Sequence, residues 1–413
     1  MRMLFAVKLK IPLVLINSSE AVQYLMVSFR DGAVIWMMFL ITRSPLDVAL
    51  ITVAKLLSGW IAPISGSLVD SWNLRRVINW TNLLRALLCF GTSFALDMKL
   101  SFVITIYLFY ILLGVVNKFY YPAFFTAYNK LLDNNARFKN MSVTNSIIMA
   151  ANVVGALFIA IGLHLDMVFA LCGVAYLYAY VILKSAFRQY TGERVAPPKA
   201  QLSLHGLSNQ LRDLNIYLKN NVGIVVLGLL GLVPEIGIKM VDMLTPKFAV
   251  NIGMDHREFY SLLLSVFSGG ASVAGLASAL WRTKDEVKRL VFLYLLSAAI
   301  VTCVGLVQNP IIDIALYAVL GGSFMVENNA RHALRVSLTD FVFNGRISSI
   351  SNTLVSNTVA LVSVAVGWVA GYVPVRTIYV LWGPATFCIV LPLLLKLRST
   401  IGSGVSQSKE ESV

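Results

Sequence analysis

The sequence predicts an all-α membrane protein with twelve transmembrane helices in two pseudo-symmetric six-helix halves. Of its 413 residues, 58% are hydrophobic and only 13% are charged, whereas about a quarter of the residues in an ordinary soluble domain are charged. Apolar runs of 18 or more residues recur along the chain, and each is long enough to cross a hydrocarbon core about 30 Å thick. Similar short patterns also recur at a spacing of just over 200 residues.

Each apolar run is expected to be a helix, because lipid offers no water to unpaired backbone groups and no run alternates as a barrel strand does. The first run follows basic residues, as a signal peptide does, but it continues through VIWMMFLIT and therefore predicts a retained helix. The twelve predicted spans are centred near residues 27, 57, 88, 112, 153, 175, 231, 270, 299, 320, 361 and 385.

Two polar segments divide the chain. Residues 185–218 contain Pro197 and Pro198 and are predicted to be a cytoplasmic linker. This places an N-terminal six-helix bundle at 1–184 and a C-terminal one at 219–398. Residues 399–413 are predicted to be a disordered cytoplasmic tail.

The two halves carry matching polar patterns. Arg75-Arg76 aligns with Lys288-Arg289 at an offset of 213 residues, and Lys139 aligns with Arg346 at an offset of 207. Similar offsets at separate places are expected of a duplicated unit. Transporters built from two six-helix halves hold their substrate near the bilayer midplane.

The basic residues predict the orientation. With the N-terminus in the cytoplasm, 24 of the 34 Lys and Arg residues fall on cytoplasmic segments, and only 5 fall on outer loops. This distribution follows the positive-inside rule and places both termini in the cytoplasm. The formal charge of +14 is therefore mostly a topology signal, and we expect no nucleic-acid partner.

The stretch GSLVDSWNLRR at residues 66–76 places three charges between two apolar spans. Its Gly66, Asp70, Arg75 and Arg76 resemble the signature loop of the major facilitator superfamily. The resemblance implies a conformational latch, in which Gly66 allows close helix approach and the charges bond across to the other half. Such bonds would favour the state with a closed cytoplasmic side and would break as access alternates.

Further stretches resemble the drug and siderophore efflux branch of that superfamily. They are RSPLDVAL, LLRALL, YYPAFFTA, NSIIMAANVVGAL and GRISSISNTLVSN, although Asn82 stands where branch members often have an acidic residue. The resemblance implies a major facilitator fold and a proton-coupled antiporter in the bacterial inner membrane that exports a siderophore, drug or metabolite. An importer of a small metabolite and a lipid or lysolipid translocator are the alternatives.

Ten charged residues fall within the predicted spans, where each costs about 2.5–3.5 kcal/mol at the bilayer centre. Their signs balance, which indicates paired charges that face a cavity rather than a pore of one sign. They are Arg30, Lys55, Arg85, Lys118, Lys239, Glu20, Asp31, Glu235, Asp242 and Glu327.

The predicted seventh helix has the densest group of charges. Glu235, Lys239 and Asp242 are spaced i, i+4, i+7 and therefore share one helix face. Pro234 and Gly237 in the same region permit bending, as in the discontinuous helices of transporter sites. The alternative is a salt-bridge cluster that only stabilises packing.

Arg30 and Asp31 form the next candidate site. Adjacent residues point about 100° apart on a helix, so we expect each to seek partners on other helices rather than pair with the other. Asp31 is the first candidate proton carrier, followed by Glu235 and Asp242. Glu20 is a further candidate, with solvation at the inner interface as its alternative.

Three other charges complete the set. Lys118 lies beside Asn117, Phe119, Tyr120 and Tyr121, a neighbourhood suited to an aromatic or anionic ligand. Glu327 is either functional or a partner for Arg331 one turn away. Lys55 and Arg85 are expected to brace helices or to extend toward the interface.

Other chemistry finds little support. The four Cys and four His are dispersed without metal-ligand spacing, and no phosphate-binding glycine loop is present. No compact nucleophile and base set indicates an enzyme. We therefore expect a monomeric transporter without cofactor or metal, whose partners are a small-molecule substrate, protons as coupling ion and the lipid bilayer.

Overall fold

The computed structural model describes residues 2–61, 65, 68–69, 72–131, 134–188, 212, 216–252, 256–278, 286–339 and 341–410. The helices of the N-terminal half are α1 (Arg2–Thr42), α2 (Pro45–Leu56), η1 (Leu57–Ile61), α4 (Leu74–Asp97), α5 (Phe102–Leu131), α6 (Asn134–Phe158), η2 (Ile159–Ile161) and α7 (Leu165–Ala186). Those of the C-terminal half are α9 (Val222–Leu230), α10 (Leu232–Asn251), α11 (His256–Ser278), α12 (Glu286–Leu306), α13 (Pro310–Leu338), α14 (Phe341–Tyr372) and α15 (Val375–Glu410). Most of the predicted linker, and Gly66 and Asp70 of the predicted latch, lie outside the described residues.

The described helices confirm the all-α prediction and follow the twelve predicted spans in order. Within the described residues, ten segments are long and apolar enough to cross a membrane, with α9 and α10 counted together. The other two spans correspond to α2 with η1, and to α4, which carries three Arg residues in its 24. At the C-terminus, α15 continues to Glu410, whereas the sequence predicted a disordered tail from residue 399.

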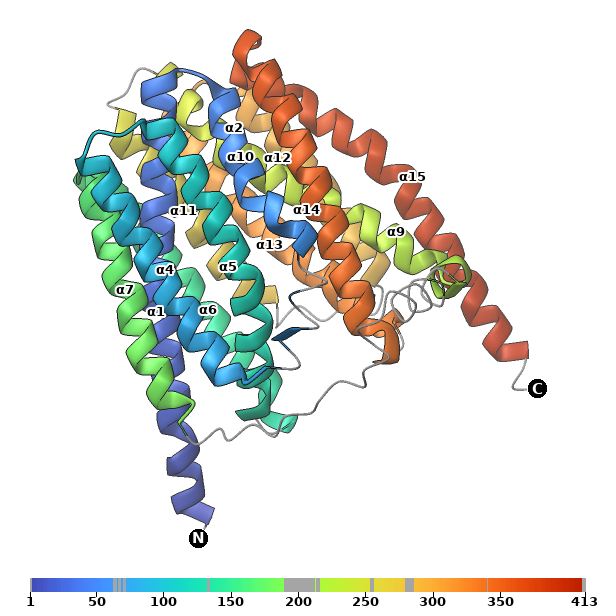
Figure 1. Ribbon diagram of the computed structural model, residues 1–413. Helices are drawn as coiled ribbons and strands as arrows, with labels where there is room; N and C mark the ends of the chain where they lie inside the picture. The colour runs from blue at the N-terminus through green and yellow to red at the C-terminus, as the bar shows by residue number, and fades with distance from the viewer. Residues whose placement is uncertain are drawn as a thin grey trace. The chain divides into compact units, whose positions relative to one another are not determined.

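The chain divides into two compact units. Figure 1 colours the chain from blue at the N-terminus to red at the C-terminus. The first comprises Met1–Leu202 and Gly253–Ser265, and the second comprises Ser203–Ile252 and Val266–Val413. In the first unit, α4 packs along α7 and α1 packs along α6 and α7. In the second, α12 packs along α15 and α13.

Glycines at equivalent positions of the two units lie where corresponding pairs of helices pack closely. Gly114 of α5 packs on α2, where a Cβ atom would lie 3.1 Å from the Lys55 carbonyl oxygen. Gly321 of α13, 207 positions later, packs on the backbone of Phe267 in α11. Small residues allow this close approach of helices within lipid. The shared contact supports the predicted duplication.

A second glycine pair repeats in the same way. Gly173 of α7 faces the Phe90 ring of α4, and a Cβ atom would lie 2.8 Å from it. Gly383 of α15, 210 positions later, packs against α12, where a Cβ atom would lie 2.6 Å from the Ala298 carbonyl oxygen. Both offsets fall within the range of 207 to 213 that the sequence patterns show. The two units therefore share one packing plan.

The predicted seventh helix is interrupted at Gly231, between α9 and α10. Pro234 has no N–H to donate to the carbonyl of Leu230 four residues earlier. The Tyr294 hydroxyl of α12 donates to that carbonyl instead, at 2.7 Å. Gly231 also lacks a side chain where the Arg331 guanidinium packs against it. The break is thus built from a proline, a glycine and two side chains of neighbouring helices.

The glycine contacts predict a stability difference between two adjacent positions. Gly270→Ala should destabilise the protein by about 1–3 kcal/mol, because its Cβ would collide with the Ala318 backbone of α13. Gly269→Ala is the matched control, since a Cβ there meets nothing within 4 Å. Thermal unfolding of the two purified variants in one detergent tests this. Equal unfolding temperatures would contradict the assigned packing of α11 on α13.

Candidate functional site

Arg30 and Asp31 of α1 lie at the centre of a polar cluster in the first unit. Arg30 is only 2% exposed, and its Nη2 and Nε donate to Asp31 Oδ1 over 2.7 and 2.9 Å. The prediction that these two residues would not pair with each other is therefore wrong. The Arg side chain is long enough to fold back onto the carboxylate, despite the angle between the two Cα–Cβ bonds.

Other helices complete the coordination of Asp31. Lys55 Nζ of α2 donates to Asp31 Oδ2 at 2.9 Å, and the Tyr110 hydroxyl of α5 donates to Oδ1 at 2.8 Å. The Lys55 ammonium also lies 4.6 Å from the centre of the Tyr110 ring. Asp31 and Lys55 are 25% and 29% exposed, so this end of the cluster is accessible. Two cations share one carboxylate, which leaves a net positive charge beside an aromatic ring.

The far side of Arg30 is closed by α5 and α7. Its Nη1 donates to the Cys172 sulfur and the Tyr176 hydroxyl, each at 3.5 Å. The guanidinium lies 5.1 Å from the centre of the Phe109 ring. Contacts with aromatic faces and neutral acceptors stabilise a desolvated guanidinium. Arg30 is therefore fixed in place, whereas Lys55 is the more accessible cation.

Arg85 of α4 lies in a second buried network. Its Nε and Nη2 donate to Asn117 Oδ1 over 2.8 and 2.5 Å. Its Nη1 donates to Gln23 Oε1 at 3.3 Å and to Asn82 Oδ1 at 3.4 Å. The guanidinium is also 3.6 Å from the centre of the Tyr120 ring. Three amide oxygens thus surround this cation, including that of Asn82 at the position where the efflux branch often has an acid.

Glu20 of α1 belongs to the same network and is buried rather than solvated. Its Oε1 accepts hydrogen bonds from the Tyr120 hydroxyl at 3.0 Å and from Gln23 Nε2 at 3.3 Å. Tyr176 joins the two networks, because it bonds Arg30 and its ring centre lies 5.4 Å from the Arg85 guanidinium. The first unit therefore contains a continuous polar path from Glu20 to Lys55.

The charges on α10 come together only in part. Lys239 Nζ lies 2.9 Å from Asp242 Oδ2, and both side chains are half-buried. Glu235 is also half-buried, and it forms no ion pair within 4 Å in the described part of the chain. Of the three predicted charges, two form a pair and the third stands apart.

Glu327 of α13 is almost fully buried in the second unit. One of its oxygens accepts a hydrogen bond from the Ser297 hydroxyl of α12 at 3.0 Å. Its other oxygen has no hydrogen-bond partner among the described residues. Arg331, the partner considered from the sequence, donates to Asn328 instead at 2.5 Å.

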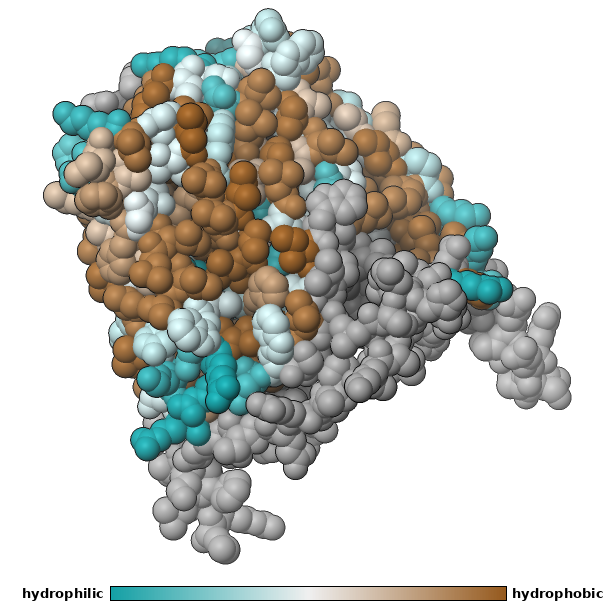
Figure 2. Space-filling model, in the orientation of Figure 1, coloured by the Kyte–Doolittle hydropathy of each residue, from teal (hydrophilic) through white to brown (hydrophobic). Residues whose placement is uncertain are grey.

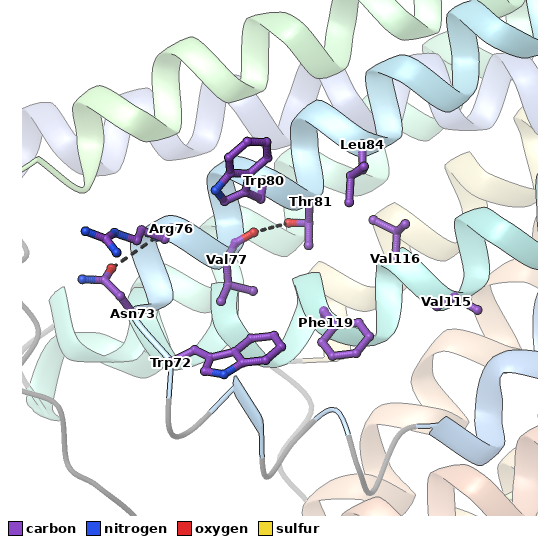
Figure 3. Close-up of a pocket in the computed structure, with 10 residues that line it drawn as sticks. All are labelled: Trp72, Asn73, Arg76, Val77, Trp80, Thr81, Leu84, Val115, Val116 and Phe119. Atoms are coloured by element: carbon purple, nitrogen blue, oxygen red, sulfur yellow. Dashed lines mark hydrogen bonds between the residues drawn. The ribbon is translucent and has the colours of Figure 1, made fainter.

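The remaining predicted residues lie apart from these clusters. Lys118 is half-buried on α5 without a hydrogen bond or ion pair in the described regions, because the same turn directs Asn117 and Tyr120 toward Arg85. Arg75 Nη2 donates to the Lys184 carbonyl oxygen at 3.1 Å. Arg76 is exposed at the end of a groove between α4 and α5 (Figure 3).

Several functional candidates were not predicted from the sequence. They are neutral side chains or lie near helix ends, so they do not stand out as charges within an apolar span. They are Gln23, Tyr110, Tyr176 and the Asp313–Arg376 ion pair of the second unit, at 3.0 Å. Asn117 and Tyr120 were noted only as neighbours of Lys118. Their shared signal is polarity within an apolar helix, which is weaker than a charge.

Comparison with solved structures shows the major facilitator fold. A mutant of the nucleoside transporter NupG superposes with a TM-score of 0.73 at 10% identity, covering 94% of this chain and 99% of that one. The POT family transporter PepTSo gives 0.71 at 13% identity, covering 94% and 98%. An auto-inhibited POT family peptide transporter gives 0.66 at 14% identity, covering 94% and 96%.

Comparison with curated protein sequences gives no significant match. The family model described as Major Facilitator Superfamily, in contrast, matches residues 21–361, which is most of the chain. Together with the helices that can cross a membrane, this match shows a multi-pass membrane protein without enzymatic activity. The chain belongs to the Major Facilitator Superfamily of secondary transporters.

Proposed function

We propose that the protein is a proton-coupled exporter of a small organic molecule that carries an anionic group. The observation that carries this proposal is the Arg30–Asp31–Lys55 cluster, with its net positive charge and its accessible Lys55. A carboxylate or similar anion is attracted to such a site. Siderophores, drugs and acidic metabolites meet this description.

Export, rather than import, is supported by the sequence resemblance to the efflux branch. Import is the second candidate, because the similar solved structures include nucleoside and peptide transporters. We place the protein as a monomer in the bacterial inner membrane with both termini in the cytoplasm, in agreement with the basic loops. Gly66, Asp70, Arg75 and Arg76 are proposed as the latch that opens and closes during alternating access.

Metabolite profiling tests the direction and the substrate class. Cells that lack the gene should accumulate an organic anion relative to cells that express it, because export of that anion has been lost. The growth medium should show the opposite change. Depletion inside the cells together with retention in the medium would support import and overturn export.

For the proton carrier we propose Glu235. Asp31 is paired with two cations and Asp242 with one, so each of these carboxylates already has a fixed charge partner. Glu235 lies within a predicted span, and its side chain is half-buried, so water in a cavity can reach it. It has no ion-pair partner among the described residues. It can therefore change protonation as its surroundings alternate between wet and dry states.

Substitutions in the charge cluster should separate stability from transport. Asp31→Asn leaves Arg30 buried without a carboxylate, which should cost about 3–5 kcal/mol of stability. Lys55→Gln keeps the Arg30–Asp31 pair, so its stability should remain near that of the wild type while transport of the anion falls. Thermal unfolding and proteoliposome transport measure the two effects. Lys55→Arg, which keeps the charge, is the control, and similar unfolding temperatures for Asp31→Asn and Lys55→Gln would contradict this assignment.

Proton coupling should depend on Glu235. In proteoliposomes, Glu235→Gln should abolish pH-driven uptake of the profiled substrate but keep counterflow, because exchange needs no net proton movement. Asp242→Asn is the matched control on the same helix and should change both activities to the same extent. Retained pH-driven uptake in Glu235→Gln would exclude this residue as the carrier. Wild-type transport that ignores the pH gradient would overturn proton coupling itself.

A further inference from the structure

A groove with a volume of about 680 Å³ lies between α4 and α5. Figure 3 shows its lining: Arg76, Val77, Trp80, Thr81 and Leu84 come from α4, Val115, Val116 and Phe119 come from α5, and Trp72 and Asn73 directly precede α4. Most of these side chains are apolar; Asn73 and Arg76 lie at one end, and Thr81 lies among the apolar ones. The groove is therefore amphipathic along its length.

The groove follows a surface that faces lipid. Along α4, Trp80, Leu84, Leu87 and Phe94 recur on one helix face, and Trp80 and Phe94 are 64% and 63% exposed. Figure 2 shows hydrophobic side chains over this side of the first unit, with hydrophilic ones beyond them. In a membrane-spanning helix such an apolar face contacts acyl chains. A hydrophobic recess of this size in that face is therefore expected to hold lipid rather than water.

The polar end of the groove carries a positive charge. Arg76 is exposed there, and its guanidinium makes no ion pair within the described part of the chain. Arg75 and Arg76 both lie in the first turn of α4, where the positive end of the helix dipole disfavours cations. An anion at this position would interact favourably with the helix end and with Arg76 at once.

Two tryptophans flank this charge. Trp72 stacks on Phe119, with ring centres 6.0 Å apart, and Trp80 lies one turn beyond Arg76. Tryptophan is enriched where acyl chains meet headgroups, because its ring is apolar and its N–H can donate a hydrogen bond. Basic pockets between transmembrane helices bind anionic lipid headgroups. The order of side chains along the groove matches that of a phospholipid.

We propose that this groove binds one anionic phospholipid, with its phosphate against Arg76 and an acyl chain along Leu84, Val115 and Val116. Trp72 and Trp80 contact the region where the headgroup joins the chains. This site shares Arg76 with the proposed latch but does not depend on the substrate, direction or coupling ion proposed above. It also lies within the first unit alone.

Tryptophan quenching by brominated lipid tests the proposal with the full chain in nanodiscs. The probes are dibrominated phosphatidylglycerol, which is anionic, and dibrominated phosphatidylcholine, which is zwitterionic, at equal mole fraction in a phosphatidylcholine background. Phosphatidylglycerol should quench part of the fluorescence at about fivefold lower mole fraction, as expected for one basic side chain at the membrane surface. The double variant Trp72→Phe, Trp80→Phe should lose this component, although the other five of the seven Trp residues remain.

Arg76→Gln should bring the preference for phosphatidylglycerol close to one while both tryptophans stay quenchable. Arg43→Gln is the matched control, because it removes an exposed Arg between α1 and α2 and should keep the fivefold preference. Equal quenching by both lipids in the wild type, or a preference that survives Arg76→Gln, would overturn the proposed headgroup contact. Absence of quenching at Trp72 and Trp80 by either lipid would show that protein, not lipid, fills the groove.

Discussion

The hydrocarbon core of a bilayer has no water, so a charge or a freed carbonyl within it is costly unless it has a partner inside the protein. Arg30 shows how this constraint shapes the first unit, because its guanidinium is bonded to Asp31, Tyr176 and Cys172 and packed on Phe109. Arg85 meets the same requirement with three amide oxygens and the Tyr120 ring. These buried charges therefore fix the positions of the helices that supply their partners.

Most of the fold could be predicted from the sequence, because span length and hydropathy are local properties. The duplication was also visible, and the glycine pairs Gly114–Gly321 and Gly173–Gly383 fall within the predicted range of offsets. Their contacts were not predictable, because the sequence does not show which neighbouring helix packs against a given glycine. The same holds for the division of the chain at Ser265, which separates two parts of a continuous helix.

The candidate site was predicted less completely than the fold. A charge in an apolar span is conspicuous, so Arg30, Asp31 and Lys55 were found, but their mutual pairing depends on side-chain reach and not on spacing. Asn117 and Lys118 show the limit most clearly. They are adjacent in sequence, and only the rotation of α5 decides that the neutral amide meets Arg85 while the charged amine does not.

The interruption at Gly231 has a mechanical consequence for the second unit. Bending between α9 and α10 would lengthen the hydrogen bond that the Tyr294 hydroxyl of α12 donates to the Leu230 carbonyl. Loss of that bond would leave a buried carbonyl without a partner, which costs about 1–3 kcal/mol, and it would disturb the packing of Leu230 and Val233 in the core of the second unit. The joint therefore has a preferred angle, to which α10 returns after a small bend.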